Sequence, residues 1–188
     1  MIEPANKLSL RSQEWIQTAL FQLMEKKPYS QISITEIADR AGLARQTFYR
    51  NYLDKDEILL KYLNGLMIGM WKDFNQSQSY SEDMFIMLFR NWQLHAPRAL
   101  IHNIMLTDRK IRQIIYKSLS EFIDELFINN DEESTADQAT NSRRYAQKSF
   151  SALVHVMLIE WTLQEYNMSP EEMGRLVNEL SASMRTFL

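Results

Sequence analysis

Apolar residues recur at helical spacing along most of the chain, and this periodicity restricts the fold more than any other feature. The first helical stripe has an i, i+1, i+4, i+5 pattern: Trp15, Ile16, Ala19, Leu20, Leu23 and Met24. No convincing alternation of apolar and polar residues indicates a strand. The 188 residues include only four glycines and four prolines, which suits long helices. The sequence therefore predicts an all-α protein.

Capping residues and helix breakers divide this periodicity into about nine helices with no internal repeat. Capping boxes, in which a serine is followed three residues later by a glutamate, open helices at Ser33 and Ser169. Residues 129–142 contain no large apolar side chain, so we expect a loop there. The helices are expected over about 9–26, from Ser33 to the Gly42 turn, 44–51, from the capping residues 54–57 to Phe74, 82–94, 98–106, 108–128, 143–166 and 170–188.

Composition and charge exclude several classes of function. The chain has no cysteine, which excludes disulfides, thiolate catalysis and cysteine-ligated metals. Its net charge is −3, and residues 1–62 hold nine Lys and Arg against eight Asp and Glu. A wholly basic nucleic-acid binder is excluded, whereas a small DNA-reading module on an acidic body is not. The histidines are scattered singly (His95, His102, His155), so we expect no metal site and no cofactor.

We expect neither an export signal nor a membrane span. The N-terminus has no basic region that leads into an apolar run. The most apolar stretch, residues 58–71, is too short to span a bilayer and contains Lys61 and Asn64. The predicted location is therefore cytoplasmic, with no membrane partner.

The segment that begins at Ser33 has the pattern of a helix-turn-helix, whose second helix enters the major groove of DNA. A short capped helix precedes Gly42, and a second short helix follows over residues 44–51. In this second helix, Leu43 and Phe48 can hold the helix against its own domain. Its other long side chains are left pointing away from the domain: Arg45, Gln46, Thr47, Tyr49 and Arg50.

These side chains suit the recognition of base edges and phosphates. Arginine pairs with guanine O6 and N7, glutamine pairs with adenine, and a threonine methyl meets a thymine methyl. Hydroxyls and the remaining cation suit phosphate oxygens. The starts of two helices can add contacts to the DNA backbone: Ser33, Thr35 and Lys55. The predicted partner is double-stranded DNA.

Two other classes of function compete with DNA binding. Short polar helices with Arg and Tyr also occur in proteins that do not bind DNA, so a helical ligand-binding or adaptor protein without DNA-reading activity is the alternative. An enzyme is not expected, because the sequence has no His-Glu-x-x-His motif, no Gly-rich phosphate loop and no recognisable Ser/His/Asp constellation.

Residues 33–55, SITEIADRAGLARQTFYRNYLDK, resemble the signature of the tetracycline-repressor-like (TetR) family of bacterial transcription regulators. The match covers about residues 9–62. One departure is Asn51, where many members carry a histidine, although asparagine can still donate to a phosphate. The similarity lies in Thr35 before Glu-Ile-Ala, the Ala41-Gly42-Leu43 turn, the Thr47-Phe48-Tyr49 core, and Tyr52 ahead of a Lys-Asp-Glu helix start.

The resemblance implies a DNA-binding head over residues 1–55 and a helical effector-binding and dimerisation domain over 56–188. It also implies a homodimer whose two heads read a near-palindromic operator in successive major grooves, roughly 34–36 Å apart. Repression is the commoner outcome in the family. The last two helices would form the dimer interface through their surplus apolar residues: Phe150, Val154, Met157, Leu158, Trp161, Met173, Leu176, Val177, Leu180 and Met184.

Family members commonly bind a small molecule in the larger domain and then release DNA. Methionines and aromatic residues suit an adaptable apolar pocket, although residues of this kind at helical spacing more often form a core. The identity of the effector cannot be predicted. Its candidate lining is Met67, Met70, Trp71, Phe85, Phe89, Trp92, His102, Met105 and Tyr116.

Overall fold

The computed structural model of the protein describes residues 4–71, 81–128 and 137–187. These residues form nine α-helices and one turn of 3-10 helix, without a strand, and this confirms the predicted all-α fold. No helix among them is both long and apolar enough to cross a membrane. In chain order the elements are α1 (Pro4–Met24), η1 (Tyr29–Gln31), α2 (Ile34–Ala41), α3 (Arg45–Asn51), α4 (Lys55–Trp71), α5 (Glu82–His95), α6 (Arg98–Met105), α7 (Arg109–Ile128), α8 (Asp137–Leu163) and α9 (Pro170–Arg185).

Two helices begin earlier than the apolar pattern predicted. α1 begins at Pro4 and α8 at Asp137, so the predicted loop over 129–142 is wrong for residues 137–142. Adding a turn to an existing helix requires only backbone hydrogen bonds, and it leaves no apolar signature in the sequence. Residues 129–136 and the predicted end of the fourth helix, 72–74, lie outside the described residues.

The end of α8 also differs from the prediction, because the helix stops at Leu163 instead of residue 166. Glu165 and Tyr166 have positive φ angles of 53° and 61°, a conformation that ends a helix. The turn is held by the Trp161 side chain, whose Nε1 donates to the carbonyl of Met168 over 2.9 Å. The ring of Tyr166 packs edge-on against Trp161 at 4.7 Å.

The chain divides into two compact units that are not simply its two halves. Unit 1 comprises Met1–Leu63 and Pro97–Ile114, and unit 2 comprises Asn64–Ala96 and Ile115–Leu188. The unit that contains the predicted head thus extends beyond residues 1–55 and includes α6 and the start of α7.

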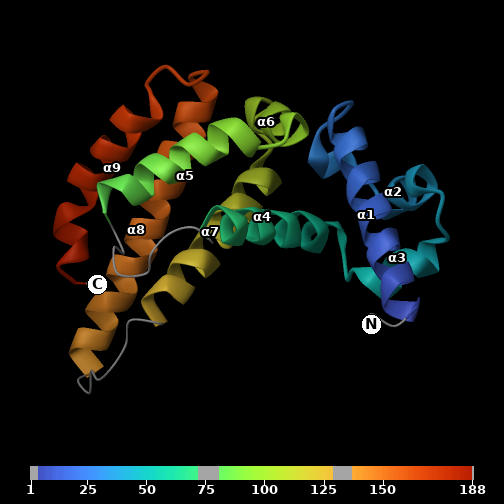
Figure 1. Ribbon diagram of the computed structural model, residues 1–188, viewed down its shortest axis with the longest axis horizontal. Coiled ribbons are helices and arrows are strands. Elements are labelled where there is room, and N and C mark those ends of the chain that lie inside the picture. The colour runs from blue at the N-terminus through green and yellow to red at the C-terminus, as the bar shows by residue number, and fades with distance from the viewer. Residues whose placement is uncertain (1–3, 72–80, 129–136, 188) are drawn as a thin grey trace. The chain divides into compact units, whose positions relative to one another are not determined.

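In unit 1, α1 packs against α2, α3 and α6, and α2 packs against α3 (Figure 1). Its core is made of fully buried apolar side chains from each of these helices, including Ile16, Leu20, Ile37, Phe48 and Leu100. Because α3 has only seven residues, this tertiary packing, and not helix propensity, holds it in place.

In unit 2, α5 and α9 run side by side (Figure 1), and α9 also packs against α8. The approach of α5 to α9 is close at Gly174, where an added Cβ would lie 2.5 Å from Ile86 Cγ1 and 2.6 Å from the backbone nitrogen of Ile86. Ion pairs join the same two helices, between Arg90 and Glu171 and between Arg175 and Glu82.

Candidate nucleic-acid interface

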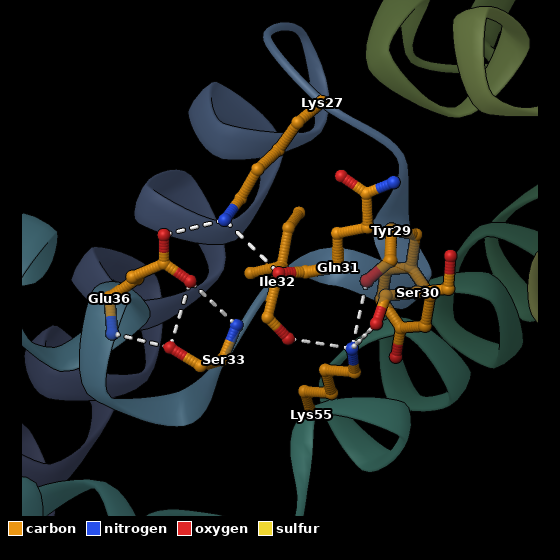
Figure 2. Close-up of polar contacts among 8 residues, drawn as sticks. All are labelled: Lys27, Tyr29, Ser30, Gln31, Ile32, Ser33, Glu36 and Lys55. Carbon is orange, nitrogen blue, oxygen red and sulfur yellow. Dashed lines mark hydrogen bonds and ion pairs between the residues drawn. The ribbon is translucent and has the colours of Figure 1, made fainter.

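The start of α2 is fixed by the predicted capping box. The amide of Glu36 donates to Ser33 Oγ over 3.2 Å, and the amide of Ser33 donates to Glu36 Oε2 over 2.9 Å. Lys27 adds an ion pair to Glu36 at 2.5 Å, and together with the Ser33 bonds it lowers the pKa of Glu36 to about 2. The glutamate therefore stays ionised at neutral pH and holds the first turn of α2 (Figure 2).

The turn between α2 and α3 requires glycine. Gly42 has a φ of 67°, in the left-handed region that other residues rarely adopt. Its amide donates to Asp39 O over 3.1 Å, and the amide of Leu43 donates to Ala38 O over 3.0 Å. These bonds satisfy the last carbonyls of α2 and turn the chain sharply into α3.

α3 presents one buried and one exposed face. Phe48 is fully buried, and Leu43 is half-buried at the start of the helix. Of the α3 residues that the sequence predicts to contact DNA, four have exposed side chains: Arg45, Gln46, Tyr49 and Arg50. Thr47 is half-buried. The tertiary packing of α3 thus leaves a row of long polar side chains free to contact a partner.

Ser33 and Thr35, at the start of α2, are also exposed. The Ser33 hydroxyl donates to Glu36 in the capping box. Thr35 is the other polar side chain at the start of this helix. Both residues lie in the same unit as α3.

Asn51 is engaged within the head. Its Nδ2 donates to Thr47 O over 2.8 Å, and its Oδ1 accepts a hydrogen bond from Ser9 Oγ at 2.8 Å. The residue thus ties the end of α3 to α1. This leaves Asn51 only one free N–H with which to reach a phosphate.

Lys55 is engaged more completely. Its Nζ lies 2.8 Å from Tyr29 O, 2.7 Å from Ile32 O and 3.4 Å from Ser30 O (Figure 2). An ammonium has three N–H donors, so these carbonyls use them all. We therefore do not count Lys55 among the proposed phosphate-binding residues. Its structural role is to fasten the chain between α1 and α2.

Sequence reasoning missed two residues that hold this same segment, Asn103 in α6 and Asp108 just before α7. The amide of Tyr29 donates to Asn103 Oδ1 over 2.6 Å, and the amide of Ser30 donates to Asp108 Oδ2 over 2.9 Å. The Tyr29 hydroxyl donates to Asp56 over 2.6 Å, and burial together with this carboxylate raises the tyrosine pKa. Asparagine on an otherwise apolar helix face was the available signal for Asn103.

The residues predicted to line an effector pocket are divided between the two units. Met67, Phe85, Phe89 and Trp92 are buried in unit 2, and Tyr116 is half-buried there. His102 and Met105 are exposed residues of α6, in unit 1. The side chains of Met70 and Trp71 lie outside the described residues.

The predicted effector and dimer residues meet in the core of unit 2. Phe85 packs against Phe150 at 5.8 Å, and Phe89 packs edge-on against Trp161 at 5.3 Å. Six of the ten residues predicted for the dimer interface are buried within the chain: Phe150, Val154, Leu158, Trp161, Met173 and Val177. Of the other four, Met157, Leu176 and Met184 are half-buried and Leu180 is exposed.

A small apolar cavity lies between α5, α7 and α8, and all of its lining residues belong to unit 2. Its volume is about 20 Å³, little more than one water-sized group needs. Of the residues predicted for the effector pocket, Phe85 alone contributes to it. The lining side chains are Met84, Phe85, Leu88, Leu119, Phe122, Ile123, Phe150 and Val154.

Comparison with known proteins identifies the family of this head. Residues 16–62, which contain α2 and α3, match the family model of bacterial regulatory proteins of the tetR family. An uncharacterized HTH-type transcriptional regulator of Haemophilus influenzae is 28% identical over 121 residues, which are 59% of this chain. The match spans only 58% of the length of that relative.

Solved structures share the fold over nearly the whole chain. The dihydroxyacetone kinase operon activator DhaS superposes with a TM-score of 0.54 at 17% identity and covers 93% of this chain and 97% of its own. FadR of Thermus thermophilus, solved with lauroyl-CoA, has a TM-score of 0.53 at 16% identity and covers 90% and 93%. The fatty acid degradation regulator FadR of Bacillus halodurans has a TM-score of 0.52 at 18% identity and covers 90% and 94%.

At these identities the solved structures show the fold alone, whereas the family match concerns the head, residues 16–62. Taken together, the capped α2, the Gly42 turn, the exposed face of α3 and the match over residues 16–62 show that the chain carries a helix-turn-helix head of the TetR family of bacterial transcription regulators.

Proposed function

We propose that the protein regulates transcription by binding a palindromic operator as a homodimer, and that a small apolar molecule releases it from DNA. The observation that carries the proposal is the exposed polar face of α3 (Arg45, Gln46, Tyr49, Arg50), which stands on a helix pinned by the buried Phe48. Such a helix fits the major groove, and its side chains are long enough to reach base edges.

The roles of these side chains follow from their chemistry. Arg45 and Gln46, in the first turn of α3, contact base edges, because the N-terminal residues of a recognition helix enter the groove most deeply. Arg50 and Thr35 contact phosphates, which position the head but carry no sequence information. Ser33 is not counted with them, because its amide and its hydroxyl both donate to Glu36. Repression follows when the operator overlaps a promoter, and the protein acts in the cytoplasm, where the chromosome lies.

The homodimer is supported by apolar side chains that remain on the surface of α8 and α9. Val156 is 53% exposed, Leu180 is 48% exposed and Phe187 is 60% exposed, and Leu176 is half-buried on the same helix as Leu180. Leu176 and Leu180 lie one helical turn apart on α9, and Phe187 follows the end of that helix. A second copy of the chain would cover this surface and supply the second head that a palindrome requires.

The effector class is supported by the cavity of unit 2. All eight lining side chains are apolar, so an uncharged or hydrocarbon portion of a ligand would enter without leaving a polar group unpaired. The cavity is far smaller than the several hundred Å³ of typical ligand sites, so binding would select a more open arrangement of α5, α7 and α8. Lauroyl-CoA in FadR of T. thermophilus is an example of such an apolar chain on the same fold.

A fluorescence-anisotropy titration against duplexes from the DNA that flanks the coding region tests the proposal. The protein is expected to bind one duplex far more tightly than random DNA, with affinity that falls steeply as salt rises. Equal affinity for every duplex, or no binding at low salt, would overturn the proposal and favour a helical ligand-binding protein that does not read DNA.

A further inference from the structure

The connection between α1 and α2, residues 25–33, is held by side chains from distant parts of the sequence. Two consecutive backbone amides of this connection, those of Tyr29 and Ser30, donate to the side chains of Asn103 and Asp108 over 2.6 Å and 2.9 Å. These partners lie 74 and 78 residues away in sequence. All four residues belong to unit 1.

Asn103 is a buried bridge between three backbone segments. The residue lies in α6 and is completely buried, and both the oxygen and the nitrogen of its side-chain amide are hydrogen-bonded. While Oδ1 accepts from the amide of Tyr29, Nδ2 donates to Met24 O over 2.8 Å and to Ala99 O over 2.9 Å. The side chain thus fixes the end of α1 and the start of η1 against α6.

Asp108 serves two purposes with its two oxygens. Oδ1 caps α7, because it accepts from the amides of Lys110 and Ile111 over 2.9 Å and 3.3 Å. Oδ2 accepts from Ser30. The carboxylate is aimed by the turn before it, in which Thr107 has a φ of 56° and the amide of Asp108 donates to Asn103 O over 3.2 Å. A β-branched residue rarely adopts that conformation, so the tertiary structure imposes it.

The same connection is held on its carbonyl side by Lys55, at the start of α4 (Figure 2). Side chains from other parts of unit 1 therefore bind both the backbone amides and the backbone carbonyls of the connection. The connection ends at Ser33, the cap of α2, and α2 leads through the Gly42 turn into α3. A change in the position of residues 29–30 consequently changes where the helix-turn-helix starts.

We propose that Asn103 and Asp108 are positioning residues for operator binding, which hold the α1–α2 connection so that α3 is presented in the orientation the operator requires. The inference rests on the proposed function, because it concerns the orientation of the same DNA-binding surface. Two recognition helices must enter successive grooves together, so a small displacement of each weakens specific binding. Non-specific binding depends on charge alone and tolerates that displacement.

Asp108 offers a substitution that separates positioning from helix capping. In Asp108→Asn, one side-chain oxygen can still cap α7, and asparagine is as good a cap as aspartate. The second oxygen becomes an NH₂ group, which cannot accept from the Ser30 amide. Asp108→Ser also keeps a capping oxygen, and its shorter side chain does not reach Ser30.

The expected loss of operator affinity in Asp108→Asn cannot be explained by the change in charge. Removing an acidic group from a DNA-binding unit strengthens its attraction to phosphates on electrostatic grounds. A weaker operator complex in Asp108→Asn therefore has to come from geometry. The matched control is Asp54→Asn, because Asp54 Oδ1 caps α4 at Glu57 over 2.9 Å and the substitution changes the charge of the same unit equally.

The experiment measures operator and random-duplex affinity by anisotropy for the parent chain and the three variants. Asp108→Asn and Asp108→Ser are expected to bind the operator on the order of 3- to 30-fold more weakly, with random-duplex affinity unchanged or higher. Asp54→Asn is expected to keep or increase both affinities. Amide exchange of Ser30 is expected to quicken in the two Asp108 variants alone.

Operator affinity that is unchanged in both Asp108 variants, while Ser30 exchange quickens, would overturn the positioning role. So would an equal loss of operator and random-duplex affinity, which indicates general damage to the head. The outcome is separate from the proposed function, which fails only if the parent chain itself does not prefer any duplex.

Discussion

Arg45 and Tyr49 form a pair on the exposed face of α3, in which Arg45 Nη2 donates to the hydroxyl oxygen of Tyr49 over 3.0 Å. The guanidinium carbon also lies 5.5 Å from the centroid of the tyrosine ring. The two residues are one helical turn apart, so the pair forms without any help from the rest of the fold. The tyrosine thereby restricts the directions in which the guanidinium can reach a base.

We expect Arg45→Ala to weaken operator binding by about 1–3 kcal/mol and to relax the sequence preference at one base pair. Tyr49→Phe keeps the ring and removes the acceptor, so it is expected to cost about 0.5–1.5 kcal/mol at the same base pair. Anisotropy against a panel of single-base operator variants measures both effects.

A double-mutant cycle shows whether Tyr49 affects operator binding through Arg45 or through a contact of its own with DNA. If Tyr49 acts by orienting Arg45, then Tyr49→Phe has no further effect in a chain that already carries Arg45→Ala. Additive losses would instead assign Tyr49 an independent contact with DNA, and an unaltered operator preference in Arg45→Ala would remove Arg45 from the base-reading face.

Leu180→Glu is expected to convert the dimer into monomers and to abolish tight operator binding. A carboxylate in an apolar interface between two copies would be buried without a partner, whereas the same group on the surface of a monomer stays hydrated. Sedimentation velocity gives the oligomeric state, and anisotropy gives the affinity.

The matched control for this substitution is Leu94→Glu. Leu94 is a 66% exposed residue of α5, outside α8 and α9, so its replacement introduces the same charge on another surface. It is expected to leave the dimer intact. A Leu180→Glu chain that still sediments as a dimer would place the interface elsewhere.

The unfolding of the head is expected to depend on pH through Glu36. Its pKa falls from 4.5 in the unfolded chain to about 2 in the folded one, because Lys27 and Ser33 bind the ionised form. A carboxyl with a depressed folded pKa stabilises fully above its unfolded pKa, and this stabilisation is lost as pH falls from about 4.5 towards 2.

Thermal unfolding of Glu36→Gln and of the parent chain over this pH range measures the contribution. The difference in unfolding temperature between them is expected to be largest near neutral pH and to narrow as the solution becomes acidic. A constant difference at every pH would show that the Glu36 charge is not responsible.

Gly174→Ala is expected to destabilise unit 2 by about 1–3 kcal/mol, because the new methyl would overlap backbone and side-chain atoms of Ile86. Gly65→Ala is the matched control: Gly65 also lies within a helix, yet nothing approaches its Cβ position within 4 Å. That substitution is expected to stabilise by about 0.5–1 kcal/mol. Denaturant titration distinguishes them, and equal effects would contradict the close approach of α5 and α9.

The order of the helices could be predicted from the sequence because its signals are local. Each capping box joins residues three positions apart, as at Ser33 and Glu36, and both boxes are present in the structure. The Gly42 turn and the buried Phe48 also follow from short-range patterns. The exposed face of α3 was predicted for the same reason.

The packing of apolar helices could not be predicted in the same way. Phe150 and Trp161 carry the apolar signal of an interface, but the structure buries them against Phe85 and Phe89 of their own chain. Periodicity shows that a helix face is apolar and does not show what covers it. Leu180 remains on the surface with an equally apolar side chain.

The sequence alone thus determined the order of the helices and which short helix carries the polar face. Only the tertiary structure decided that Lys55 and Asn51 fasten the head internally and that Asn103 and Asp108 reach the α1–α2 connection. Capping and periodicity depend on neighbours a few residues apart, whereas these hydrogen bonds join residues between 23 and 78 positions apart and exist only after the helices have packed.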